Sequence, residues 1–169
     1  DTISDYKRSQ KIFSYALYTS IPGVYDGKIM GIVSPAVEGN LETGTPFGSM
    51  SGLIYKSMPS IVRSKYVVPA EVFEIEDYEL KYYLISAFAL ADENITLIGT
   101  ANPTSILKII KLIKTEGDQL IRDIKNGTLE KLLSSANEVP TERQTDDAIE
   151  QILASFKSNP SRGRQLERI

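Results

Sequence analysis

The stretch GKIMGIVSPAVEGNLETGTPFGSMSG, residues 27–52, decides the fold of this chain. It contains an apolar run, Ile29–Val33, that predicts a buried strand at Lys28–Val33, and Ser34-Pro35 ends the run because proline cannot donate to a strand ladder. The loop that follows is rich in glycine and in hydroxyl side chains. In α/β proteins such a strand end is a usual place for a ligand, and the alternative is a long surface connection that binds nothing.

A second buried strand is predicted at Ile95–Ile98, and the rest of the chain reads mainly as helices. Apolar spacing and capping residues predict helices at 5–20 (capped by Ser4 or Asp5), 51–62 (broken by Pro59), 71–90, 104–114 (ended by Gly117), 119–125 and 129–134, then one capped by Asp146 and one opened by Asn159-Pro160. Polar residues 134–145 are expected to form a linker or surface loop. The first helix, with Ile12 and Phe13 on one face, is expected to pack on the sheet, and Leu53 is expected to be buried.

Two strands are too few for a covered sheet, because about five or six strands are usual. The missing strands are therefore expected from flanking sequence. Without this flanking sequence, the chain is expected either to rearrange as a largely helical domain or to bury its exposed strand edges by pairing with a second copy, which would give a homo-oligomer.

Composition excludes several classes of function. The chain has 169 residues, 41% of them hydrophobic and 24% charged, which fits one soluble globular domain. Its net charge of −3 gives no reason to expect nucleic acid. It contains no cysteine and no histidine, which excludes disulfides, thiolate and histidine metal sites and Ser-His-Asp hydrolysis. No apolar run approaches the ~20 residues of a membrane span, so no membrane partner and a cytoplasmic location are expected.

Five segments, in this order and spacing, resemble one known family: SPAVEG, TPFGSMSGLIYKSMP, VFEIEDYELKYY, LIGTANPTSILKII and EGDQLIRDIKNGTL. They are similar to bacterial members of the auxin-responsive Gretchen Hagen family, which are acyl acid–amido synthetases of the adenylate-forming superfamily, related to luciferase and acyl-CoA synthetases. The resemblance implies a helix-rich α/β fold that is part of the large N-terminal domain, with helices on a mixed sheet completed by flanking sequence. Residues 1–135 would be the central part of that domain, and 136–169 its linker and C-terminal helices.

Three motifs of that family do not occur in the chain: its T-S-G-T-T-x-G phosphate loop, its Y-x-S/T-x-E nucleotide motif and its ribose-binding aspartate. The chain, which also lacks an initiator methionine, therefore looks like an internal piece of a longer ligase. That parent enzyme would activate a carboxylic acid with ATP and Mg²⁺ and transfer the acyl group to an amine or thiol. The piece alone is expected to be inactive, to hold neither ATP nor metal tightly, and to contain no catalytic residue.

Two stretches are predicted to form walls of the acyl pocket for a small carboxylic acid. By resemblance the first is the strand-end loop, and the second joins a strand end to a helix N-terminus, where backbone amides favour an anion. The predicted residues are Ser34, Pro35, Ala36, Val37, Glu38, Thr100, Ala101, Asn102 and Ser105. The alternatives are a plain strand-terminating turn for the first stretch and N-capping by Asn102 or Thr104 for the second.

Three further clusters are interpreted as structural. Thr45–Ser49 could cradle a phosphate but lacks the lysine and spacing of a Walker loop, so an ordinary turn is favoured. The acidic cluster of residues 74–79 could imitate a metal site, and a solvated helix face is favoured. Arg162, Arg164 and Arg168 are expected on a solvated surface or against missing sequence. The competing hypothesis for the whole chain is a non-catalytic binding or structural module.

Overall fold

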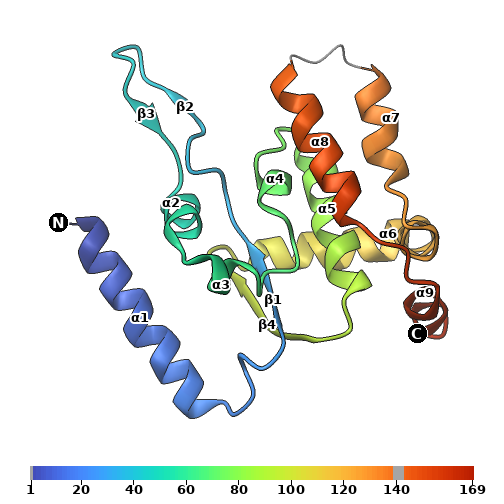
Figure 1. The fold of residues 1–169 in the computed structure, drawn as a ribbon, viewed down its shortest axis with the longest axis horizontal. Coiled ribbons are helices and arrows are strands. Elements are labelled where there is room, and N and C mark those ends of the chain that lie inside the picture. Colours follow the sequence, from blue (N-terminus) through green and yellow to red (C-terminus); the bar gives the residue numbers. More distant parts are fainter. Residues whose placement is uncertain (1, 139–142) are drawn as a thin grey trace.

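Helices make up most of the chain, and two short parallel strands lie among them (Figure 1). The structure, a computed structural model, describes residues 2–138 and 143–169. Within them the elements are α1 (Thr2–Ser20), β1 (Lys28–Ile32), β2 (Gly39–Asn40), β3 (Pro46–Phe47), α2 (Met50–Ser57), α3 (Ser60–Arg63), α4 (Ala70–Phe73), α5 (Tyr78–Ala91), β4 (Ile95–Thr100), α6 (Thr104–Asn126), α7 (Glu130–Glu138), α8 (Arg143–Ser155) and α9 (Pro160–Leu166). The predicted helix-rich α/β class is confirmed.

The helix α5 forms the centre of the core. Every residue from Tyr82 to Phe88 is buried, so this helix is covered on all sides where it crosses the core. It packs against α6 and α4, and the Phe88 ring meets Phe156, just after α8, edge to face at 5.1 Å. Burial of this apolar surface is the main favourable term that holds the helices together.

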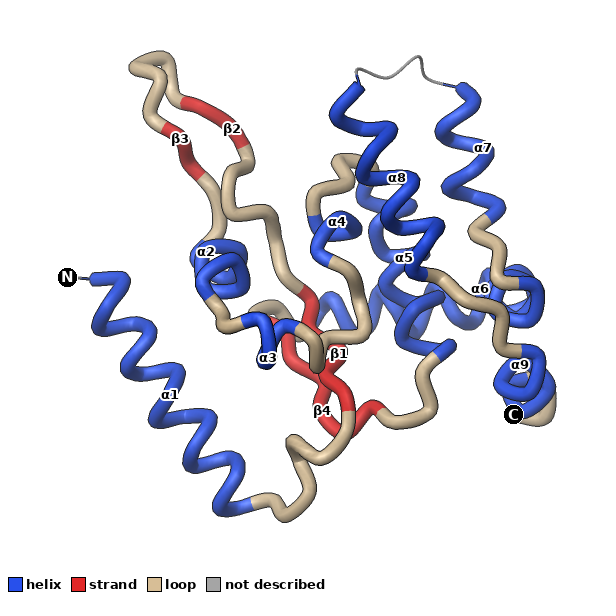
Figure 2. Tube along the Cα trace, viewed as in Figure 1, coloured by secondary structure: helices blue, strands red, loops and turns tan. Residues whose placement is uncertain are grey.

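Strands β1 and β4 lie side by side in parallel, as Figure 2 shows, and both were predicted from the sequence. Ile32 of β1 pairs with Thr100 of β4, so the carboxyl ends of both strands lie at the same edge. On its other side β1 exchanges backbone hydrogen bonds with Lys65 and Val67. Gly31 faces the Tyr66 ring so closely that a Cβ atom there would collide with it.

The second edge of β4 pairs with no strand among the described residues. Beside that edge lies an apolar hollow of about 580 Å³ between β4, α5 and α6. Its walls include Ile98 of β4 and the predicted isoleucine stripe of α6, Ile106, Ile109, Ile110 and Ile113. Part of the apolar surface of α6 is therefore left uncovered in this chain.

The glycine-rich loop contains a hairpin that sequence analysis did not predict. Strands β2 and β3 pair antiparallel and project away from the helices (Figure 2). Each of these strands is only two residues long. The Leu41 amide donates to the Thr45 carbonyl at 2.9 Å and closes the tip of the hairpin. Strands of two residues are too short to carry an alternating pattern that can be read from the sequence.

Several predicted helix boundaries were wrong for local reasons. The predicted helix 71–90 is two helices, because Asp77 accepts a 2.8 Å hydrogen bond from the Leu80 amide and starts α5 anew. The predicted helices 104–114 and 119–125 are the two parts of α6, which meet at a kink where Glu116 departs from helical backbone angles, one residue before the predicted end at Gly117. The predicted break at Pro59 is confirmed, whereas Leu53 is exposed and Tyr55 is buried instead.

The expected linker at residues 134–145 is mostly helical. Helix α7 continues to Glu138 and α8 already begins at Arg143, so Asp146 lies inside α8 and does not cap it. Residues 139–142 lie outside the described part of the chain. Polar residues are common both in loops and on the exposed sides of helices. The polar composition of this segment therefore did not distinguish the two.

Helix α1 does not pack on the sheet, contrary to the prediction. Its Ile12 and Phe13 side chains are 64% and 63% exposed, and Leu17 is only partly buried. The turn that follows α1 directs it away from the rest of the molecule in Figure 1. None of the helices, taken over the described residues, has the length and apolar character needed to traverse a bilayer.

The C-terminal helix α9 closes the open end of α5. Asn159 caps α9 by accepting from the Arg162 amide at 3.1 Å, as its position before Pro160 predicted. Its side-chain amide donates to the Ala91 carbonyl at 3.3 Å, and the Arg162 guanidinium donates to the Leu90 carbonyl at 2.8 Å. Arg162 therefore satisfies the last turn of α5, which corrects the expectation that it lies on a solvated surface.

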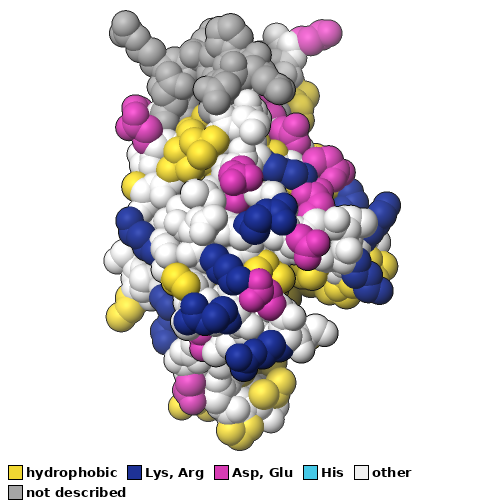
Figure 3. Space-filling model, turned by 90° about the vertical axis from the view of Figure 1, so that its right-hand side faces the viewer, with side chains coloured by type: hydrophobic (Ala, Val, Ile, Leu, Met, Phe, Trp, Pro, Cys, Tyr) yellow, Lys and Arg dark blue, Asp and Glu magenta, His cyan; other side chains and the backbone are white. Residues whose placement is uncertain are grey.

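The side of the molecule shown in Figure 3 carries basic and acidic side chains intermixed. One ion pair of this kind joins Lys125 of α6 to Glu167, just after α9. A face of mixed sign lacks the continuous basic stripe that nucleic acids require.

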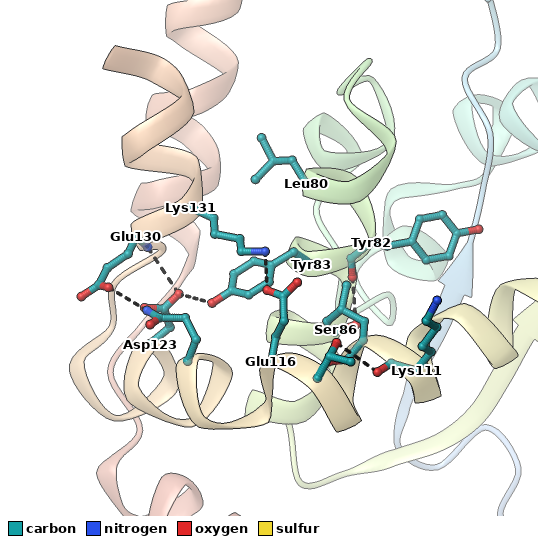
Figure 4. Close-up of polar contacts among 12 residues, drawn as sticks. Leu80, Tyr82, Tyr83, Ser86, Lys111, Glu116, Asp123, Glu130 and Lys131 are labelled. Atoms are coloured by element: carbon teal, nitrogen blue, oxygen red, sulfur yellow. Dashed lines mark hydrogen bonds and ion pairs between the residues drawn. The ribbon is translucent and has the colours of Figure 1, made fainter. Parts of the chain in front are cut away.

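A buried carboxylate joins α5, α6 and α7 (Figure 4). Asp123 has no solvent exposure and accepts hydrogen bonds from the Tyr83 hydroxyl at 2.7 Å, Gln119 at 3.1 Å, Thr128 at 3.0 Å and the Glu130 amide at 3.3 Å. Beside it Lys131 pairs with Glu116 and lies over the Tyr83 ring. A buried charge is tolerated when it is satisfied this fully.

Candidate functional site

A cleft of about 140 Å³ lies at the carboxyl ends of β1 and β4. Segments that follow each strand line it, together with the first turns of α5 and α6. Its walls are Ile32, Val33, Ser34, Ser51, Tyr78, Lys81, Tyr82, Ile85, Thr100, Ala101, Asn102 and Ser105. The two separately predicted stretches thus meet in one cleft, as expected for the carboxyl ends of neighbouring parallel strands.

Five of the predicted site residues line this cleft. They are Ser34, Thr100, Ala101, Asn102 and Ser105. The other four, Pro35, Ala36, Val37 and Glu38, are not among the lining residues. Ala36 is buried, Val37 is 49% exposed, and the Glu38 amide donates to the Phe47 carbonyl at 2.8 Å where the hairpin begins. These four residues form the connection from β1 to the hairpin, with a bend at Ala36.

The glycine and serine residues after β3 have structural tasks. A Cβ atom on Gly48 or Gly52 would collide with the backbone around Ala36, so both positions require glycine's small size. Ser49 caps α2 by accepting from the Gly52 amide at 3.0 Å, and it donates to the Ser34 carbonyl at 2.9 Å. Thr45–Ser49 therefore contains strand β3 and the cap of α2, which corrects the ordinary turn favoured from the sequence.

Local hydrogen bonds hold the entrance to α6. The Asn102 side chain accepts from the Thr104 amide at 3.0 Å and from the Thr104 hydroxyl at 2.8 Å. The Thr100 hydroxyl donates to the Asn102 carbonyl at 3.0 Å and accepts from its amide at 3.2 Å. Asn102 thus forms a side-chain turn just ahead of α6, whose N-cap residue is Pro103 without a side-chain cap, so the predicted alternative of N-capping by Asn102 or Thr104 does not occur as such.

A chain of hydroxyl groups crosses the cleft wall. The Tyr78 hydroxyl donates to the Tyr82 hydroxyl at 3.1 Å, which in turn donates to the Ser105 hydroxyl at 2.8 Å. Burial raises the pKa of Tyr82, whereas the hydrogen bond with Tyr82 is the main cause that lowers the pKa of Tyr78. The Lys108 ammonium lies 3.8 Å from the centre of the Tyr78 ring.

Lys81 is the one cation that lines this cleft among the described residues. Burial lowers its pKa, and the nearby carboxylates Glu74, Glu38 and Glu76 oppose that effect only in part. Lys81, Tyr78 and Tyr82 line this cleft but were not predicted as site residues from the sequence. The signal available in the sequence was a lysine beside two tyrosines in an otherwise apolar helix. The side of the helix on which these residues lie depends on where the helix begins, which the Asp77 cap sets.

Metal-ligand geometry is not found in the described residues, where no group of acidic side chains is arranged to hold an ion. Glu74, Glu76, Asp77 and Glu79, the acidic cluster singled out from the sequence, are all exposed. Asp77 serves as the cap of α5, and Glu74 pairs with Lys56 at 3.2 Å. These carboxylates therefore face solvent, and only Glu79 lies on α5 itself.

Comparisons with known proteins place this architecture. The family model described as "GH3 family N-terminal domain" matches residues 2–169. The fold is similar to that of a solved "GH3.15 acyl acid amido synthetase", with a TM-score of 0.73, 20% identity and coverage of 98% of this chain and 28% of that one. It is also similar to an "AtGH3.15 acyl acid amido synthetase in complex with 2,4-DB", with a TM-score of 0.68, 18% identity and the same coverage. The comparison with curated proteins returned no match.

Proposed function

We propose, because this chain belongs to the GH3 family, that it forms part of the acid-binding site of an acyl acid amido synthetase. The observation that carries the proposal is the cleft at the ends of β1 and β4, which brings together Ser34, Thr100 and Ser105. Its lining combines apolar side chains with a few hydroxyl groups and one ammonium group, which is the usual composition of a small-molecule site. Relatives of similar fold carry the name of this activity.

The proposed reaction has two steps in the longer parent enzyme. An oxygen of the carboxylic acid attacks the α-phosphorus of ATP, pyrophosphate leaves, and an acyl adenylate forms. An amine or thiol then attacks the acyl carbon, and AMP leaves with the bonding electrons. The task of this chain is to hold the acid so that its carboxyl group is presented to the nucleotide, which lowers the entropic cost of the first step.

The nucleotide is proposed to bind outside this chain. The glycine- and serine-rich loop does not fit a phosphate, because Gly48 and Gly52 sit against the backbone of Ala36 and Ser49 caps α2. The chain spans 28% of the length of the solved structures that it matches. We therefore assign the ATP and Mg²⁺ contacts, and the strands that continue the sheet, to other parts of a longer protein. Within this chain, residues 1–135 and 136–169 would belong to one large domain.

Calorimetric titration of the purified chain tests this function. Aromatic and aliphatic carboxylic acids should bind, and ATP should not bind tightly. Pyrophosphate exchange with the same acids should give no turnover, because the groups that hold the phosphates are absent. Tight binding of ATP or clear turnover would contradict the placement of the nucleotide site. Binding of neither class of ligand would support the competing hypothesis of a structural module.

A further inference from the structure

The ammonium group of Lys81 stands out among the lysines of the described residues. The side chain is partly buried and lines the cleft beside Ile32 and Ile85, yet within the described residues it makes neither an ion pair nor a hydrogen bond. Other partly covered lysines have partners: Lys131 pairs with Glu116, and Lys125 with Glu167. A partly desolvated cation without a partner favours the arrival of an anion.

The acidic residues near Lys81 do not provide an anionic partner for its ammonium group. Glu74, Glu38 and Glu76 act on it only at longer range, and burial still outweighs them. Glu74 is itself paired with Lys56, and Glu38 lies at the exposed base of the hairpin. The positive charge therefore remains directed to the cleft and not to a neighbour in the chain.

A second donor in the same cleft fits a carboxylate. The hydroxyl chain runs from Tyr78 through Tyr82 to Ser105, so the Ser105 hydroxyl accepts a hydrogen bond and its own hydrogen has no acceptor within the described residues. Ser105 lies on the cleft wall formed by α6, and Lys81 on the wall formed by α5. A carboxylate accepts through two oxygens, which one ammonium and one hydroxyl can serve together.

We propose that Lys81 is the counter-ion for the carboxylate of the bound acid, with the Ser105 hydroxyl as the second donor in the cleft. This inference rests on the proposed function and names the group that distinguishes a carboxylic acid from its neutral analogues. A charge-assisted hydrogen bond in a half-buried site gives a preference of about tenfold or more for the acid over its amide.

Matched ligand pairs test the assignment on the purified chain. Benzoate and benzamide, and hexanoate and hexanamide, differ in charge but hardly in shape. The wild-type chain should prefer each acid by about tenfold or more. Lys81→Met should bind acid and amide equally while Lys81→Arg keeps the preference. Lys111→Met, which changes a lysine of the adjacent cleft, is the control and should behave as wild type.

Nuclear magnetic resonance provides a readout that a merely structural lysine would not give. The ammonium resonance of Lys81 should shift on addition of acid and stay in place on addition of amide. Inorganic phosphate and AMP are added in parallel, and a response to them in place of the acids would overturn the carboxylate assignment. Thermal melting of each variant verifies that it is folded.

The outcomes separate the two proposals. If the wild-type chain binds acids in the cleft and Lys81→Met keeps the full preference for acid over amide, the role of Lys81 is refuted and the acid site stands. If acids leave the resonances of Tyr82 and Ser105 unchanged, the acid site itself is refuted, and the role of Lys81 with it.

Discussion

The hydroxyl of Tyr83 on α5 donates a 2.7 Å hydrogen bond to the buried carboxylate of Asp123 on α6, 40 positions further along the chain. Asp123 also accepts from the Glu130 amide at the start of α7, so one carboxylate fixes three helices relative to one another. Replacement by alanine leaves the buried Tyr83 hydroxyl and three partly buried donors without this acceptor. We expect Asp123→Ala to lower the free energy of unfolding by about 3 kcal/mol, as measured by urea denaturation.

The control for this prediction is Asp123→Asn, which keeps one carbonyl oxygen as an acceptor and should cost less than alanine. A loss for Asp123→Ala no larger than that of an ordinary surface change, about 0.5 kcal/mol, would show that the network does not stabilise the fold.

Alkaline pH should destabilise the chain through the same tyrosine. Burial, the hydrogen bond to Asp123 and its charge raise the pKa of Tyr83 far above the ordinary tyrosine value of 10.0. In the unfolded chain Tyr83 loses its proton near that value while the folded chain retains it. The free energy of unfolding therefore falls as pH rises beyond 10.

Denaturation series at pH 9, 10 and 11 check this dependence. The Tyr83→Phe variant, which has no proton to lose, should show a shallower decline than wild type over the same series. Equal slopes for the two proteins would mean that other groups dominate the alkaline transition.

A substitution pair separates the cleft from the hairpin base. Ala101 lines the cleft, whereas Val37, predicted from the sequence to line the acyl pocket, is exposed outside it. Ala101→Leu should weaken the binding of bulky acids by about tenfold or more, because the added atoms occupy ligand volume. Val37→Leu should leave acid binding nearly unchanged. Calorimetry with one series of acids measures both, and a stronger effect at Val37 would favour the original prediction for that residue.

The open edge of β4 should promote association of the chain with itself. Ile98 on this strand is 56% exposed, and the apolar hollow of β4 and α6 adjoins it. Exposed strand edges with apolar side chains pair readily with other chains. Static light scattering should show a mass that rises with concentration, and Ile98→Lys should suppress the rise. Ile61→Lys, at a 77% exposed apolar residue of α3, is the control. A strictly monomeric wild-type chain would contradict this prediction.

The strands could be predicted from the sequence because Ile29–Val33 and Ile95–Ile98 are largely apolar runs bounded by turn residues. The division of the predicted helix 71–90 into two helices could not be predicted. It depends on whether Asp77 caps a helix or lies on the exposed face of one, and an acidic residue suits both positions. For the cleft, Ser34 and Thr100 were predicted separately as strand ends.

That these strand ends face a single cleft follows from the parallel pairing of β1 with β4, which no local pattern contains. Lys81 was missed because the environment of a helical lysine is set by tertiary contacts. Residues distant in the chain, such as Ile32 and Ser105, form the cleft that Lys81 lines.

The bonds from Asn159 and Arg162 to the end of α5 also set an order of events during synthesis. The carbonyls of Ala91 and Leu90 receive their donors from residues 68 and 72 positions later. In a nascent chain that has not yet reached Asn159, these two carbonyl groups at the end of α5 have no side-chain donor. They are exposed to water or to non-native partners. The helix that completes the end of α5 is thus translated well after α5 itself, and a ribosome that stalls between the two leaves that end of the core open.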